Sequence, residues 1–370
     1  MQLLQLDIAD FRNLAQVTLR PSPRATILCG RNGQGKTNLL EAIHLLATLK
    51  PLRAGRLAEL VRFGEERARI GGSFQGPGGE RRVAVEVTPG GRATWLDGKP
   101  IGAERLDAYF EGLAAVCFTP DDLLLVKGGP ELRRRFVDRA AFNRWPAVLG
   151  EAREYLHALR ARNAALRTTD EDVERSFRAQ LVQAAGRLLS RRHALVAELT
   201  PRLRVAFAEI AGPDAPEAYL EYRPASGMPR QGQAAELAGR LEEILALRLE
   251  RDRERGYTSA GPHMDDLVLA IGGRGARTYG SQGQQRALVL ALKIAEIENL
   301  RATMGRPPLL LLDDVSSELD REKNRHLLEY LSRLPGQAFL TTTDRRLLEP
   351  AVGPEAAFYR VENGALSTEI

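Results

Sequence analysis

This chain is poor in cysteine, in aromatic residues and in long apolar runs, and each shortage excludes a class of protein. Its two cysteines, Cys29 and Cys117, lie far apart in apolar stretches and have no metal-ligand spacing, so we expect buried structural thiols. Phe, Trp and Tyr make up only 6% of the residues, which argues against a platform that stacks single-stranded bases. The chain has no run of 18 apolar residues, and its alternating start lacks the features of a signal peptide. We therefore expect a cytoplasmic protein that does not enter a membrane.

The charge of the chain is carried mainly by arginine. There are 47 arginines and six lysines, the net charge is +5, and the isoelectric point is about 9.3. Guanidinium groups pair well with phosphate oxygens, but a GC-rich genome also produces an arginine-rich protein. Apolar residues make up 44% of the chain, which is enough for a buried core. The composition therefore favours a polyanionic partner only mildly.

The order of the predicted elements indicates a nucleotide-binding domain that is split by an insertion. In the first part of the chain, the apolar patterns predict strands at 2–8, 15–19 and 24–29, a helix at 36–48, and antiparallel strands within 70–96. After a mainly helical stretch, they predict a strand at 267–271, a helix at 282–300, a strand at 309–313, and a helix–strand pair at 321–342. We expect an α/β fold with an antiparallel β subdomain. An ATPase lobe would span 1–119 and 256–370, and a helical lobe 120–255.

A glycine-rich loop lies between a predicted strand and a predicted helix. Its residues fit the pattern G-x-x-x-x-G-K-[ST] and are Gly30, Arg31, Asn32, Gly33, Gln34, Gly35, Lys36 and Thr37. Such a loop turns its backbone N–H groups inward on phosphates, and the following helix adds positive potential. We expect this loop and Asn38 to bind ATP, with Lys36 reaching the β- and γ-phosphates and Thr37 ligating Mg²⁺.

Two carboxylates follow an apolar run of four leucines at 309–312. The run is typical of a buried parallel strand, and ligands bind at the carboxyl ends of such strands. Asp313 is therefore the predicted Mg²⁺ ligand. Asp314 is placed to orient or deprotonate the attacking water, and the alternative is that it only caps the next turn.

A further motif at 279–286 precedes an apolar helix and resembles the signature sequence of ABC-type ATPases. It reads Tyr279, Gly280, Ser281, Gln282, Gly283, Gln284, Gln285 and Arg286, with Gln282 at a position where the family has glycine. Taken alone, Ser281 could be an ordinary helix N-cap. In the ABC family this serine contacts ATP held by a partner subunit, which implies an ATP-dependent homodimer with Ser281 and Gln284 at the nucleotide.

The resemblance to ABC-type ATPases has two gaps. The segment Ser316-Ser317-Glu318-Leu319-Asp320 resembles the family's D-loop, but Thr343 stands near the position of the usual switch histidine. The glutamine of the loop between lobes is not evident near Thr119-Pro120.

Three stretches resemble the RecF family of bacterial recombination mediators, and they occur in the family's order. They are Asp10-Phe11-Arg12-Asn13, the segment from Pro120 to Pro130 followed by Arg133-Arg134-Arg135-Phe136-Val137-Asp138, and Gly261-Pro262-His263-Met264-Asp265-Asp266. The resemblance implies that Arg12 helps to hold the nucleotide. The arginines at 133–135 could be functional or could be structural partners of Asp138, and His263 reads as a loop histidine with satisfied hydrogen bonds.

Membership of that family would imply a weak, DNA-stimulated ATPase that dimerises around ATP on gapped or junction DNA. With RecR and RecO, such proteins promote RecA loading in recombinational repair and the SOS response. Two rival interpretations are an SMC-like ATPase that structures DNA and, less favoured, the ATPase subunit of a membrane transporter. About 250 residues without heptads separate the phosphate loop from the signature, which is too long for the transporter subunit and too short for SMC arms.

Overall fold

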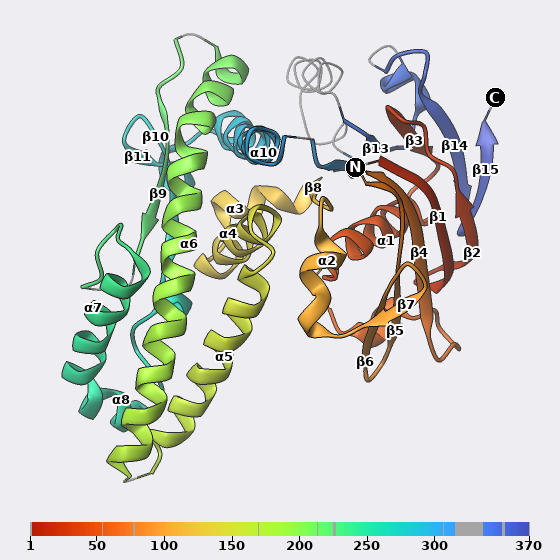
Figure 1. Cartoon of the computed structure of the whole chain (residues 1–370). Coiled ribbons are helices and arrows are strands. Elements are labelled where there is room, and N and C mark those ends of the chain that lie inside the picture. Colours follow the sequence, from red (N-terminus) through yellow and green to blue (C-terminus); the bar gives the residue numbers. More distant parts are fainter. Residues whose placement is uncertain are drawn as a thin grey trace. The chain divides into compact units, whose positions relative to one another are not determined.

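The computed structural model describes residues 2–314 and 336–369, apart from 54, 77, 169, 213, 225–226, 306 and 350–351. The chain divides into two compact units (Figure 1). One contains Met1–Asp122 and Leu300–Ile370, and the other contains Leu123–Asn299. The predicted boundaries at 120 and 256 mark the start and end of the stretch rich in helix formers, and these units begin and end at other residues. The lobe boundaries themselves therefore stay a prediction.

The first unit contains an antiparallel sheet built from the N-terminal part of the chain. Its strands, in spatial order, are β2 (Leu14–Leu19), β1 (Gln2–Phe11), β4 (Ala68–Gly76), β5 (Gly79–Thr88), β6 (Gly91–Leu96) and β7 (Lys99–Ile101). Asp97 and Gly98 join the last two strands with φ values of +50° and +77°, which is the two-residue hairpin that this dipeptide predicts. On β5, Val83, Val85 and Val87 are buried at alternate positions, as expected for a sheet with one face on the core.

A second, mainly parallel sheet of the same unit carries the polar motifs at its strand ends. Its strands, in spatial order, are β15 (Ala365–Glu369), β14 (Ala357–Glu362), β3 (Ala25–Cys29), β13 (Ala338–Thr342), β12 (Leu309–Leu312) and β8 (Ala115–Phe118). Because β3, β13 and β12 are parallel neighbours, their carboxyl ends lie at one edge of the sheet. All four leucines of β12 are buried, as a parallel strand requires.

Helix α1 (Lys36–Thr48) packs against strands of both sheets of this unit. It is consequently buried on nearly every side, which explains why its sequence is apolar well beyond a single stripe. The short helix α2 (Leu106–Phe110) packs nearby, where the Tyr109 hydroxyl donates a hydrogen bond to the carbonyl oxygen of Leu46. The helix that follows the phosphate loop is therefore fixed firmly in the core.

The second unit is mainly helical and contains a small antiparallel sheet. Its helices are α3 (Leu124–Lys127), α4 (Pro130–Arg144), α5 (Val148–Ala165), α6 (Glu171–Ala211), α7 (Ala234–Leu247), α8 (Leu249–Arg255) and α9 (Ala276–Tyr279). Its strands are β9 (Ala218–Arg223), β10 (Asp266–Ile271) and β11 (Arg274–Gly275). Helix α10 (Gln282–Met304) begins in this unit, and its last residues belong to the first. The long helix α6 packs along α5 and α7 (Figure 1).

The structure confirms the α/β class and most of the predicted elements, including the helix at 36–48 and the strand of leucines. The strands β8, β9, β14 and β15 were not predicted. They are four to six residues long, and periodicity does not distinguish strand from helix in such short segments. The predicted helix from 321 and the D-loop-like segment at 316–320 lie outside the described residues. Within the described part of the chain, no helix combines the length and apolar character needed to cross a membrane.

The family-like motifs of the second unit bind one another in a buried polar network. Arg133 makes a two-pronged ion pair with Asp266, at 2.7 and 3.0 Å, and also donates to the carbonyl oxygen of Gly128. Asp138 pairs instead with Arg192, at 2.8 and 3.0 Å. Pairing of the 133–135 cluster with Asp138, one of the two alternatives that the sequence leaves open, is therefore wrong. The true partner of Arg133 lies 133 residues further along the chain, at the start of β10.

His263 is a neutral structural residue of this network. Its Nε2 lies 2.9 Å from the carbonyl oxygen of Thr258, which can only accept, so Nε2 carries the proton. Its Nδ1 then accepts a hydrogen bond from the Tyr155 hydroxyl at 2.5 Å. Burial, more than any neighbouring charge, lowers the pKa of His263 and keeps the ring neutral. This confirms the interpretation of His263 as a loop histidine with satisfied hydrogen bonds.

A second histidine of this unit makes folding stability sensitive to acid. His193 is 9% exposed, packs edge-on against Tyr222, and has no hydrogen-bond partner for its ring nitrogens among the described residues. Burial and the neighbouring charge of Arg192 lower the pKa of His193 to about 4. In the unfolded chain the group titrates near 6.5, so stability that is present above this pH is lost as the pH falls towards 4.

We expect a His193→Phe variant to lose this part of the acid sensitivity. The wild type should lose about 3 kcal/mol more free energy of unfolding than the variant between pH 7 and pH 4. Urea unfolding at several pH values measures the difference. Equal losses in both proteins would contradict the assignment to His193.

Candidate functional site

The phosphate loop has the backbone shape that an anion cradle requires. The residues from Gly30 to Gly35 connect β3 to α1, and Gly33 and Gly35 have φ values of +80° and +114°, which only glycine adopts readily. Gly35 occupies the N-cap of α1 and has no side chain to accept from the first-turn N–H groups. These donors and the positive end of the helix are therefore available to a phosphate group.

Lys36 is folded into the loop. Its side chain is buried, and its ammonium group donates to the carbonyl oxygens of Gly30 at 2.6 Å and Arg31 at 2.9 Å. Burial lowers the pKa of Lys36, and the negative charges of Asp314 and Asp313 oppose that shift. Three of the predicted catalytic residues, Lys36, Asp313 and Asp314, are thus close enough for their charges to interact.

Asp313 lies directly after β12 and accepts hydrogen bonds from two threonines. The Thr37 hydroxyl lies 2.8 and 2.9 Å from the two carboxylate oxygens, and the Thr341 hydroxyl donates to one of them at 2.9 Å. A hydroxyl and a carboxylate oxygen are ligands that suit Mg²⁺, which also keeps waters and binds substrate phosphates. The pair Thr37 and Asp313 therefore fits the predicted magnesium site.

Asp314 has a left-handed backbone, with φ at +47°. Its N–H group donates to the Thr341 hydroxyl at 2.8 Å, so Thr341 is bonded to both acids. The sequence had directed attention to Thr343, which lies two residues further on, beyond the end of β13. Thr341 was missed because a run of three threonines does not show where β13 ends, and Thr341 and Thr343, two residues apart, share the same side-chain alternation.

Arg12 is held beside α1 by a buried carboxylate. Glu41 accepts from Arg12 at 3.0 and 3.2 Å and from the side chain of Arg53 at 3.1 Å. Burial alone would raise the pKa of Glu41, but the two guanidinium groups bring it below its usual value. Next to Arg12, Asn13 accepts from Asn38 at 2.8 Å. Glu41 and Arg53 were not predicted, because nothing in their local sequence distinguishes them from other helix and loop charges.

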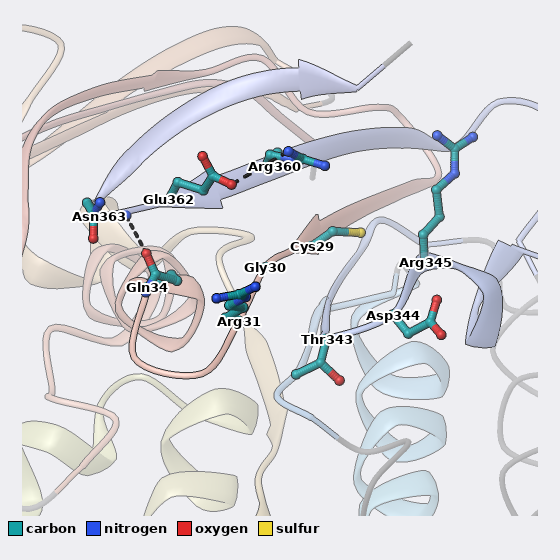
Figure 2. A pocket seen from close by; sticks show the side chains of 10 residues that line it. All are labelled: Cys29, Gly30, Arg31, Gln34, Thr343, Asp344, Arg345, Arg360, Glu362 and Asn363. Carbon is teal, nitrogen blue, oxygen red and sulfur yellow. Dashed lines mark hydrogen bonds and ion pairs between the residues drawn. The ribbon is translucent and has the colours of Figure 1, made fainter.

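A pocket of about 710 Å³ opens beside the phosphate loop (Figure 2). Its walls come from the loop, from the end of β13 and from the C-terminal hairpin β14–β15. The lining residues are Cys29, Gly30, Arg31, Gln34, Thr343, Asp344, Arg345, Arg360, Glu362 and Asn363. Three arginines outnumber the two acids there, so the lining carries a small positive charge. Both cysteines of the chain are buried, as expected, although Cys29 also reaches this pocket.

The signature-like segment lies in the other unit and forms a capping box at the start of α10. The N–H of Gln284 donates to the Ser281 hydroxyl oxygen at 3.2 Å, and the N–H of Ser281 donates to the Gln284 side chain at 2.9 Å. Ser281 remains exposed. The side chain of Gln285 stabilises the preceding turn by donating to the carbonyl oxygens of Ala276 and Gly280. The segment thus presents an exposed hydroxyl at a helix N-terminus.

Comparison with known proteins agrees with this combination of fold and motifs. The family model for the RecF/RecN/SMC N-terminal domain matches residues 2–366. A DNA replication and repair protein RecF from Anaeromyxobacter sp. (strain Fw109-5) is 72% identical over 367 residues, which cover 99% of each chain. The corresponding RecF protein of Myxococcus xanthus (strain DK1622) is 54% identical over 372 residues, covering 99% of this chain and 97% of that one.

Solved structures give the same assignment. A structure of the recombination mediator protein RecF-ATPrS in the RecFOR pathway has a TM-score of 0.89 and 27% identity, covering 100% of this chain and 98% of that one. An Smc head domain derived from Pyrococcus furiosus has a TM-score of 0.56 and 14% identity, covering 100% and 96%, and shares the fold alone. The chain thus has the architecture of the RecF/RecN/SMC class. Within that class it belongs to the RecF family.

Proposed function

We propose that this chain is an ATP-dependent DNA-binding recombination mediator that dimerises around ATP. The observation that carries the proposal is that one chain has two helix N-termini that suit an anion and that differ in their side chains. One is the phosphate loop with Lys36 and Asp313, and the other is the exposed Ser281 at the start of α10. In the ABC-type ATPases that this chain resembles, one nucleotide contacts one of each kind, and two-fold symmetry would supply the second from a partner copy.

In the proposed site, each residue of the first unit has a separate task. The inward N–H groups of the loop and the Lys36 ammonium bind the phosphates of ATP. Thr37 and Asp313 hold Mg²⁺, which, when bound, offsets the charge of the phosphate oxygens. Asp314 orients the attacking water and accepts its proton. An aspartate reaches less far than the glutamate usual at this position, so we expect slow, DNA-stimulated turnover.

The DNA-related part of the proposal comes from the relatives, which are named as DNA replication and repair proteins. We infer that the ATP-bound dimer binds gapped or junction DNA in the cytoplasm through sequence-independent contacts to phosphates. It would act with RecR and RecO to promote RecA loading in recombinational repair and the SOS response. The net charge of +5 is compatible with such a partner.

A second candidate is an SMC-like ATPase that structures DNA outside recombination, since the chain shares its fold with Smc heads. Binding to purified RecR discriminates the two, because only the recombination mediator requires it. Specific RecR binding at micromolar concentrations or below supports the first proposal, and its absence favours the second.

We expect a Lys36→Ala variant to bind ATP about a hundredfold more weakly than the wild type, because a charged donor to the phosphates is lost. Titration with a fluorescent ATP analogue measures the affinity. Lys50→Ala is a matched control, since Lys50 is an exposed lysine that follows the same helix. Unchanged affinity of the Lys36→Ala variant would contradict ATP binding by this loop.

The proposed function is tested by binding to a gapped duplex in the presence of ATP, of ADP and of no nucleotide. We expect ATP to tighten binding, Lys36→Ala to abolish that effect, and affinity to fall steeply with salt concentration. Equal DNA affinity in all three nucleotide conditions would overturn the proposed ATP dependence.

A further inference from the structure

The turn of the C-terminal hairpin is bonded to the phosphate loop (Figure 2). This turn consists of Asn363 and Gly364, between β14 and β15. The N–H of Asn363 donates to the side-chain oxygen of Gln34 at 2.7 Å, and the N–H of Gly364 donates to the carbonyl oxygen of Gln34 at 2.9 Å. A residue in the middle of the loop is thus held, at its side chain and its backbone, by a segment near the other end of the chain.

The packing of the hairpin against its neighbours leaves no room for a side chain at two glycines. A Cβ added at Gly364 would lie 2.2 Å from the carbonyl oxygen of Asn13, and Gly364 also has a φ of +78°. A Cβ added at Gly30 would lie 2.4 Å from the carbonyl oxygen of Val361 in β14. Both obstacles are backbone atoms, which cannot rotate away as a flexible side chain could. The hairpin therefore rests directly on the first residue of the loop and on the turn that precedes β2.

A second segment holds the same carbonyl group of Gln34. The Asn13 side chain donates to the carbonyl oxygen of Gln34 at 3.3 Å and accepts from Asn38 of α1. Gly33, by contrast, has open space where its Cβ would be. The bonds to Gln34 use only its acceptor atoms, so they leave the N–H donors of the loop for a bound phosphate. A loop held in this way needs little rearrangement when the anion arrives.

We propose that Gln34 is a positioning residue through which the C-terminal hairpin keeps the phosphate loop in its nucleotide-binding shape. This inference rests on the proposed binding of ATP. If the hairpin favours the shape that binds ATP, then bound ATP must favour the docked hairpin to the same extent, because the coupling between two equilibria is reciprocal. The C-terminal strands of the chain thereby become part of its nucleotide site through their contact with Gln34.

The test compares ATP affinity and thermal stability in Gly364→Ala and in Gln34→Met. The alanine methyl group must displace the turn from Asn13, and methionine keeps the length of glutamine but cannot accept from Asn363. We expect each variant to raise the Kd for ATP about tenfold, with the effect mainly in KM rather than in kcat. Ala365→Ser, at an exposed position of the same hairpin, is the matched control and should bind ATP within twofold of the wild type. The double variant should be little weaker than the poorer single variant, because both changes break one connection.

Hydrogen–deuterium exchange separates this coupling from a purely structural role, because a hairpin that only stabilises the fold would not become more protected when ATP binds. ATP should slow exchange in residues 359–366 of the wild type, and this protection should be lost in Gln34→Met. If Gly364→Ala does not fold, Gln34→Met carries the test alone. Wild-type ATP binding together with unchanged affinity and unchanged protection in Gln34→Met would overturn this inference and leave the proposed function intact. A wild type that does not bind ATP at all would overturn both.

Discussion

An Asp314→Asn variant is expected to bind ATP as the wild type does but to hydrolyse it about a hundred- to ten-thousandfold more slowly. The side chain follows β12 at the edge where the phosphate loop begins, and its charge acts on Lys36. Asparagine has nearly the same size and tolerates the left-handed backbone at this position, so the local fold should persist. The amide cannot accept a proton from water, and that loss accounts for the expected effect.

Phosphate release under single-turnover conditions measures this effect, with ATP affinity determined separately. Asp7→Asn provides the control, since Asp7 is an exposed acid on β1 of the same unit. Full hydrolytic activity in Asp314→Asn would remove Asp314 as the general base. Asp314 would then have only the capping role that was the alternative.

Replacing Arg133 by alanine is expected to destabilise the second unit by about 3–5 kcal/mol. Arg133 is buried, pairs with Asp266 through two nitrogens, and donates to backbone carbonyl oxygens of the preceding turn. Its removal leaves a half-buried carboxylate and buried carbonyl oxygens without their donor. The structure therefore assigns this arginine to the fold rather than to a contact with DNA.

The neighbouring Arg135 supplies the matched control. It is exposed and pairs with Glu131 one helical turn away, a contact that contributes less than about 0.5 kcal/mol. Urea unfolding of both alanine variants, together with their DNA affinity, separates the two roles. Normal stability with lost DNA affinity in Arg133→Ala would contradict the structural role.

The parts of the site that depend on neighbours in the chain were predictable from the sequence. Local backbone requirements explain three of these features. They are the glycines that permit positive φ values, the lysine at the start of a helix, and the acids after an apolar strand. The strand–loop–helix around Lys36 and the emergence of Asp313 at a strand end follow from such patterns. The reciprocal cap of Ser281 and Gln284 has the same local origin, because its two partners are three residues apart.

What the sequence did not reveal depends on contacts between distant segments. Arg133 pairs with Asp266 and not with Asp138, which is nearer in the sequence. Thr341, rather than Thr343, contacts Asp313 and Asp314. The hairpin that holds Gln34 lies 329 residues away from it. Such pairings are set by strand register and by the packing of whole elements, and no local pattern records them.

The central claim, that ATP joins two copies of this chain through Ser281, is tested most directly by sedimentation velocity of the wild type and Ser281→Arg, each with ATP and with ADP. The account predicts a wild-type dimer with ATP only, and a Ser281→Arg monomer that still binds ATP with wild-type affinity. A wild type that stays monomeric with saturating ATP and gapped DNA, or a Ser281→Arg variant that dimerises as the wild type does, would contradict it.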